Sequence, residues 1–155
     1  MVSSKAINKE LTMPKTTAQL IIAVVFLVQC ASSLASPDAV KLKINQQSFT
    51  LKIPQTTKQY YQGLMYIHHL PKRTGMIFAV DPRDQRKMSM WMKNTYIPLD
   101  MLFIGPDYRI TCIRKNTKPL SLKHISCPSP TMAVIEINGG ETNKFHLAKG
   151  MKIGK

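Results

Sequence analysis

The chain places four residues that could do chemistry within ten positions: Trp91, Lys93, Asn94 and Asp100. Lys93 could anchor an anionic group, and Asn94 could orient that group through its amide. Asp100 lies inside an apolar run, so it needs a partner if it is buried. We expect residues 88–94 and 99–104 to pair as antiparallel strands, which would set Lys93 opposite Asp100. The pair would then either hold the strands in register or form the polar centre of a pocket.

Methionines and histidines surround this segment and suggest a second chemistry. The residues concerned are Met65, Met76, Met88, Met90, Met92, Met101, His68, His69 and His124. Thioethers and imidazoles can hold copper(I), so soft-metal binding is one alternative. However, Met88, Met90 and Met92 alternate as on one face of a strand, which favours gap-filling in a core. We therefore predict no metal site and no cofactor.

Common catalytic motifs are missing from the sequence. It has no nucleophile elbow, no glycine loop for phosphate and no zinc-protease helix. Seven of the 8 acidic residues follow residue 35, too few to single out a pair for glycoside hydrolysis. A non-catalytic binding domain is therefore favoured, and an enzyme centred on the four residues named first stays open.

Two cysteines of the main domain, Cys112 and Cys127, are candidates for a disulfide bond. An even pair in an exported protein is often bridged, because the compartment is oxidising. Two buried free thiols are the alternative. No Cys-x-x-Cys motif supports a redox or zinc-ribbon role.

Short strands separated by turns must position these side chains. Apolar and polar residues alternate over 40–44 and 49–53, and Thr56 or Thr57 could begin a short helix. A second short helix is expected over 141–147. Further strands are expected over 76–80, 88–94, 99–104, 108–113, 131–137 and 151–153. The polar stretch 114–129 is expected to be an ordered loop. This pattern predicts a mainly β fold, a single jelly-roll-like sandwich or barrel with one or two short helices.

Several of these segments together resemble the domain of unknown function 192 family. The resemblance rests on Gly63-Leu64-Met65-Tyr66, Gly75-Met76-Ile77-Phe78, Trp91-Met92-Lys93-Asn94-Thr95 and Ile97-Pro98-Leu99-Asp100, with Val134–Ile137 and Gly140 near the end. It implies a compact β fold of jelly-roll type, often exported, and no established reaction, substrate or cofactor. This chain departs from the family pattern at Gln59–Gln62, Ile67 and Met151, where members often carry charged residues.

The amino-terminal segment has the features of a secretion signal. Lys5, Lys9 and Lys15 precede the apolar run 20–28, which is too short to span a bilayer as a helix. Ser33-Leu34-Ala35 fits a signal-peptidase site, so we expect a signal peptide over 1–35, cleavage after Ala35 and one β domain over 36–155. The protein would then be periplasmic or secreted. The alternatives are a lipoprotein anchored through Cys30 and an uncleaved anchor.

Charge favours anionic partners for the exported domain. Three of the 22 Lys and Arg residues and one of the 8 acidic residues precede residue 36, which leaves 19 − 7 = +12. Such a field attracts anionic envelope components, and membrane-surface contact is possible on this basis, although a basic surface can also serve solubility alone. Nucleic acid is not favoured, because the basic residues are scattered. We therefore expect an exported domain that binds an envelope component, an anionic ligand or a protein partner. An enzyme acting on an envelope glycan or a small anionic molecule, and periplasmic copper binding, are the alternatives.

Overall fold

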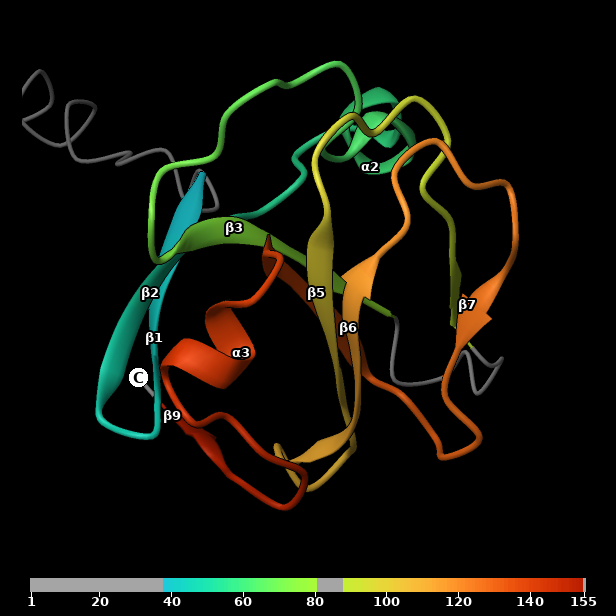
Figure 1. Ribbon diagram of the computed structural model, residues 1–155. Helices are drawn as coiled ribbons and strands as arrows, with labels where there is room; N and C mark the ends of the chain where they lie inside the picture. Colours follow the sequence, from blue (N-terminus) through green and yellow to red (C-terminus); the bar gives the residue numbers. More distant parts are fainter. Residues whose placement is uncertain (1–37, 81–87, 155) are drawn as a thin grey trace, which may run out of the picture. The chain divides into compact units, whose positions relative to one another are not determined.

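A curled seven-stranded sheet forms the body of the domain in the computed structural model, which describes residues 38–80 and 88–154 (Figure 1). The expected signal peptide and Cys30 lie outside the described residues. The elements are β1 (Ala39–Ile44), β2 (Gln47–Lys52), α2 (Thr57–Gln62), β3 (Thr74–Ala79), β4 (Ser89–Met90), β5 (Leu99–Ile104), β6 (Ile110–Thr117), β7 (Ile125–Ser126), β8 (Ala133–Asn138), α3 (Glu141–Lys144) and β9 (Ile153–Gly154). The prediction of a mainly β domain with short helices is therefore confirmed.

The strands run in the order β6-β5-β8-β3-β2-β1-β9, and β4 pairs separately with β7. Neighbours are antiparallel except β2 and β3, which are parallel. The two edges of the sheet approach each other, because the Ile110 amide donates to Met151 and the Ile153 amide to Tyr108, each at 2.9 Å. No helix in the described ranges is long and apolar enough to cross a membrane.

Local sequence explains several boundaries. The β1–β2 hairpin turns at Asn45 and Gln46, both with positive φ, as a two-residue hairpin turn requires. Thr56 caps α2, since its hydroxyl accepts from the Gln59 amide at 3.1 Å. The helix ends at Gly63, whose φ of 50° favours glycine, so it is shorter than expected.

The central strands β5 and β8 are buried on both faces. One face carries the cluster of Ile135, Ile137, Leu102 and Phe49, over which α3 lies (Figure 1). The other face carries a second cluster that includes Phe78, Met92, Met101, Phe103 and Val134. Because both faces pack, a polar side chain on either strand must be hydrogen-bonded or must face a cavity.

The predicted pairing of 88–94 with 99–104 is wrong. β5 pairs instead with β6 on one side and β8 on the other, which gives this apolar strand two neighbours. Of the first segment only β4 is a strand, and Asn94 has a φ of 52°, which interrupts extended structure. The expected loop over 114–129 is also shorter, because β6 continues through Thr117 and β7 follows.

Cys112 on β6 and Cys127 after β7 lie next to each other, with Cα atoms 6.3 Å apart. That separation lies within the range that a disulfide spans. The bond would tie β6 to the β7 segment, which otherwise pairs only with β4 among the described strands.

We predict that Cys112→Ser combined with Cys127→Ser lowers the free energy of unfolding by about 3 kcal/mol, because a loop of this length loses that much closure entropy when it is bridged. Urea unfolding of both proteins, with and without dithiothreitol, measures the difference. Reductant should lower the stability of the wild type to that of the variant. Two free thiols in the oxidised, unfolded wild type would contradict the prediction.

Candidate functional site

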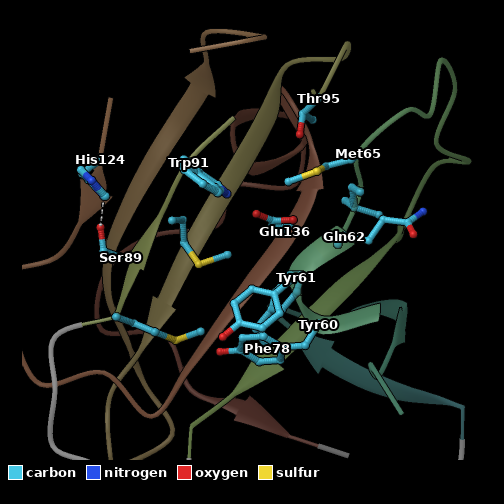
Figure 2. Close-up of a pocket in the computed structure, with 14 residues that line it drawn as sticks. Tyr60, Tyr61, Gln62, Met65, Phe78, Ser89, Trp91, Thr95, His124 and Glu136 are labelled. Atoms are coloured by element: carbon cyan, nitrogen blue, oxygen red, sulfur yellow. Dashed lines mark hydrogen bonds between the residues drawn. The ribbon is translucent and has the colours of Figure 1, made fainter. Parts of the chain in front are cut away.

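A pocket of about 260 Å³ opens on the second face of the sheet, between α2 with its following turn and the 88–95 segment. Its described lining is largely aromatic and sulfur-containing, with a few polar groups: Tyr60, Tyr61, Phe78, Trp91, Met65, Met88, Met90, Leu64, Ser89, Thr95, His124, Gln62, Gly63 and Glu136. Figure 2 shows the Glu136 carboxyl between Trp91 on one side and the two tyrosines on the other.

Strand alternation brings Glu136 into this pocket. In β8, Ile135 and Ile137 belong to the first cluster, whereas Val134 belongs to the second, so Glu136 shares its face with Val134. Its neighbours in register are Met76 on β3 and Met101 on β5. The carboxyl therefore meets two thioether side chains across the sheet rather than a charged partner.

The environment of Glu136 is unusual for a carboxyl group. The residue is 4% exposed, and no hydrogen bond or ion pair links its side chain to another described residue. Desolvation by burial raises the pKa of Glu136 from 4.5 to about 8. Near pH 7 most molecules therefore hold a neutral carboxylic acid here, which can donate a hydrogen bond as well as accept one.

Aromatic rings form two walls around this carboxyl. Tyr60 meets Phe78 edge to face, with ring centroids 5.5 Å apart, and Tyr61 in the same way at 6.1 Å. Trp91 stands on the opposite wall and is 43% exposed. The Lys93 ammonium lies 5.2 Å from the centroid of the Trp91 ring, although Lys93 is not part of the pocket lining.

The structure separates the four residues that the sequence proposed as one cluster. Trp91 lines the pocket, and Lys93 is exposed beside it. The side-chain amide of Asn94 donates to the Tyr66 hydroxyl at 2.7 Å, and the backbone carbonyl of Asn94 accepts from the Tyr66 backbone amide at 2.8 Å. Asn94 thus joins the Trp91 segment to the turn after α2, which together form both walls.

Asp100 lies on the opposite face of the sheet and is fully buried. Its carboxylate accepts from the Asn116 amide at 2.8 Å, the Thr142 amide at 2.9 Å and the Thr142 hydroxyl at 2.6 Å. The expected Lys93–Asp100 pair is therefore wrong, because the described residues show no such ion pair and β5 has other neighbours. Asp100 instead holds the start of α3 against β5 and β6.

The methionines divide between the two environments. Met76, Met92 and Met101 are buried in the second cluster, as a core interpretation predicts. Met65, Met88 and Met90 are half-buried and line the pocket. His124 also lines it, with Nδ1 3.0 Å from the Ser89 hydroxyl, while His68 stacks on Tyr96 elsewhere. Among the described residues no group of three His, Cys, Asp or Glu side chains could hold a metal ion.

A shallower hollow near α3 contains another buried acid, Glu141. One carboxyl oxygen accepts from the Arg73 amide at 2.9 Å, and the other has no hydrogen-bond partner among the described residues. Burial raises the pKa of Glu141, and the Arg73 amide opposes that shift. The described lining of this hollow includes His69 but no Phe, Tyr or Trp, so it offers less apolar ring surface to a ligand than the pocket around Glu136.

Sequence reasoning missed Glu136 because it stands inside an apolar strand, Val134–Ile137, which looks like ordinary core. A weak signal was present. A lone acid at a position where alternation demands an apolar residue is unfavourable for folding, and such positions are often functional.

A family model of uncharacterised proteins, DUF192, described as "Uncharacterized ACR", matches residues 40–154. A solved protein of unknown function from Novosphingobium aromaticivorans is 28% identical to this chain, with a TM-score of 0.68, over 79% of this chain and 89% of its own. A solved protein from Sinorhizobium meliloti, described as a candidate transcription regulator, is 31% identical, with a TM-score of 0.67, over 77% of this chain and 97% of its own. No curated protein matches.

We predict that Glu136→Gln changes how stability depends on pH. Between pH 4.5 and about 8 the folded state keeps a proton on Glu136 that the unfolded chain releases, so the free energy of unfolding falls as pH rises through this window. Relative to the variant, the wild type should lose about 3 kcal/mol between pH 5 and pH 8. Urea unfolding at both pH values measures this loss. Parallel pH profiles for the two proteins would contradict it.

We also predict that Asp100→Ala lowers the free energy of unfolding by about 3 kcal/mol, since three donors, two of them buried, lose their acceptor. Lys93→Ala is the matched control, because it removes an exposed side chain and should change stability by less than about 0.5 kcal/mol. Chemical denaturation compares them. Equal losses of unfolding free energy in both variants would contradict this prediction and support a Lys93–Asp100 pair.

Proposed function

This chain belongs to the uncharacterised DUF192 family, and from that premise we propose that it is an exported, non-catalytic domain whose pocket at Trp91 and Glu136 binds a small ligand from the cell envelope. The single observation that carries the proposal is the buried Glu136 at an aromatic-lined pocket, where its carboxyl has no partner among the described residues. Burying a carboxyl without a partner opposes folding by several kcal/mol. Stability therefore does not explain this arrangement, whereas binding of a ligand that pairs with the carboxyl does.

Pocket chemistry narrows the class of ligand. Tyr60, Tyr61 and Trp91 offer ring faces and edges, which favour a flat or cyclic body. Glu136 offers one polar contact at the inner end. The volume of about 260 Å³ is below that of typical drug-sized sites, so a single-ring molecule, or one ring of a larger envelope molecule, fits best.

Export is supported by sequence and by the cysteine pair. The 1–35 segment has the charge and apolar run of a signal peptide, and Cys112 and Cys127 stand where an oxidising compartment could bridge them. We propose a periplasmic or secreted location with cleavage after Ala35; anchoring through Cys30 is the alternative. The +12 charge of residues 36–155 favours an anionic envelope surface as the setting in which the ligand is met.

An enzyme is the second candidate, and one contact favours it. The Ser89 hydroxyl and His124 Nδ1 lie 3.0 Å apart at the edge of the pocket, within reach for a nucleophile and its base. Such a pair would suit acyl transfer on an envelope glycan or a small anionic ester. If a fluorophosphonate probe labels the wild type and does not label Ser89→Ala, the result would support this candidate over simple binding.

Copper(I) binding is a third candidate, because Met65, Met88 and Met90 line the same pocket as His124. Thioether and imidazole ligands suit this ion. Silver(I), a redox-stable substitute, tests it by titration, with Met90→Leu as the variant that removes one thioether.

We predict that single-ring molecules bind in the pocket and change the emission of Trp91, the only tryptophan of the chain. Tyr61→Ala should weaken the binding about tenfold, because it removes one ring contact worth about 1 kcal/mol or slightly more. Fluorescence titration and thermal shift measure this effect.

Tyr108→Ala is the matched control, since Tyr108 is exposed and lies in the turn between β5 and β6, away from the pocket lining. It should bind every ligand as the wild type does. A library of several hundred single-ring compounds in which none shifts Trp91 emission or the unfolding temperature would refute the proposed function.

A further inference from the structure

We propose that the ligand of this pocket carries a positive charge, as an organic ammonium, and that this ammonium pairs with Glu136 between Trp91 and Tyr61. The inference rests on the proposed function and deepens it, because it names the chemical class of the ligand. It departs from the anionic ligand that the net charge of the chain suggests.

The geometry supplies both parts of a cation site. Glu136 is 4% exposed as a residue, and its carboxyl has no hydrogen-bond or ion-pair partner among the described residues. Trp91 and Tyr61 stand on either side of it, and Tyr60 stands beside Tyr61 (Figure 2). Ring faces attract ammonium groups, and the attraction grows when water is excluded. The Trp91 ring already receives one ammonium, that of Lys93, whose Nζ lies 5.2 Å from its centroid.

A charged carboxylate in this place also discriminates against other ligands. An anion would be repelled by it, and a neutral hydroxyl would recover only part of the solvation that burial removed. An ammonium of any kind is attracted to the carboxylate by its charge. An ammonium that carries N–H groups adds a charge-assisted hydrogen bond, which is about twice as strong as a neutral one. Of the three classes, the cation gains most from Glu136.

The other groups that face Glu136 do not replace such a partner. Across the sheet, β3 and β5 present Met76 and Met101, which are apolar. The titratable groups among the described lining are Tyr60 and Tyr61 on α2 and His124 before β7. No ion pair to Glu136 from Lys or Arg is formed within the described residues.

Methionines suit the remainder of the ligand. Met65, Met88 and Met90 are half-buried and line the pocket beside the aromatic rings. Thioether side chains are flexible and polarisable, so they can pack against the carbon atoms around an ammonium of varied shape.

Binding a cation must release a proton from Glu136. Burial raises the pKa of Glu136 to about 8 in the free protein, and a bound ammonium favours the ionised carboxylate. Affinity for a permanently charged ligand should therefore rise with pH up to about 8 and then level off, by about tenfold in total between pH 7 and pH 9. Affinity for a neutral ligand should lack this rise, and affinity for an anion should fall.

The test uses three probes with the same ring and different charge: benzyltrimethylammonium, benzyl alcohol and benzoate. Trp91 fluorescence and calorimetry give their dissociation constants at pH 7 and pH 9. We expect the cation to bind at least about tenfold more tightly than the alcohol at pH 9, and benzoate to bind more weakly than both. Glucosamine against N-acetylglucosamine, and butylamine against butanol, then distinguish an amino sugar from an alkylamine as the source of the ammonium.

Glu136→Gln keeps the shape of the side chain and removes its charge, so it should lose both the preference for the cation and the rise with pH, while still binding benzyl alcohol. Glu141→Gln is the matched control, because Glu141 is a buried acid outside this pocket. It should keep the preference and the pH profile of the wild type.

Each outcome decides the inference. Equal affinity for the cation and the alcohol would overturn it and leave the proposed function standing, whereas no binding of any probe at either pH would overturn both. Tight binding of silver(I) that survives Glu136→Gln and is lost in Met90→Leu, without a preference for organic cations, would overturn the inference in favour of a soft metal.

Discussion

Burial of β5 and β8 on both faces is the constraint on which the rest of this structure depends. Each strand has a neighbour on either side and a packed cluster above and below, so each polar side chain needs a partner within the fold or an opening to a cavity. One carboxyl group lies on each face, Asp100 on the first and Glu136 on the second. The two meet this requirement in opposite ways.

Asp100 is satisfied within the fold. Three donors from Asn116 and Thr142 surround its carboxylate, so the buried charge holds β6 and α3 against β5. Glu136 faces a pocket instead, and no donor from residues 38–80 or 88–154 reaches its carboxyl. A satisfied buried acid acts as structural support, whereas an unsatisfied one lowers stability and prepares the site to take a partner.

The pocket exists because α2 and the 88–95 segment cover the second face incompletely. The hydrogen bonds between Asn94 and Tyr66 hold these two coverings together, and Gly63 ends α2 close to Phe78, where an added Cβ would lie 3.1 Å from its ring. The walls are thus fixed to each other as well as to the sheet. The high net charge of the chain does not oppose an ammonium at Glu136, because charges beyond about 8 Å are screened at physiological salt, whereas a buried pair is not.

Local patterns in the sequence were enough for much of the fold. Alternation located β1 and β2, and apolar runs located β5 and β8, each within a few residues. Thr56 indicated the start of α2, and the family motif indicated a compact β domain. These signals act between residues that are close in the chain.

Tertiary structure alone decided the pairing of strands and the roles of the acids. The 88–94 segment pairs with residues more than thirty positions later, at Ile125 and Ser126, and no local pattern encodes that choice. Asp100 and Glu136 look alike in sequence, since each is a lone acid in an apolar run. Their difference comes from donors that arrive from distant segments, at Asn116 and Thr142, on one face of the sheet and not on the other.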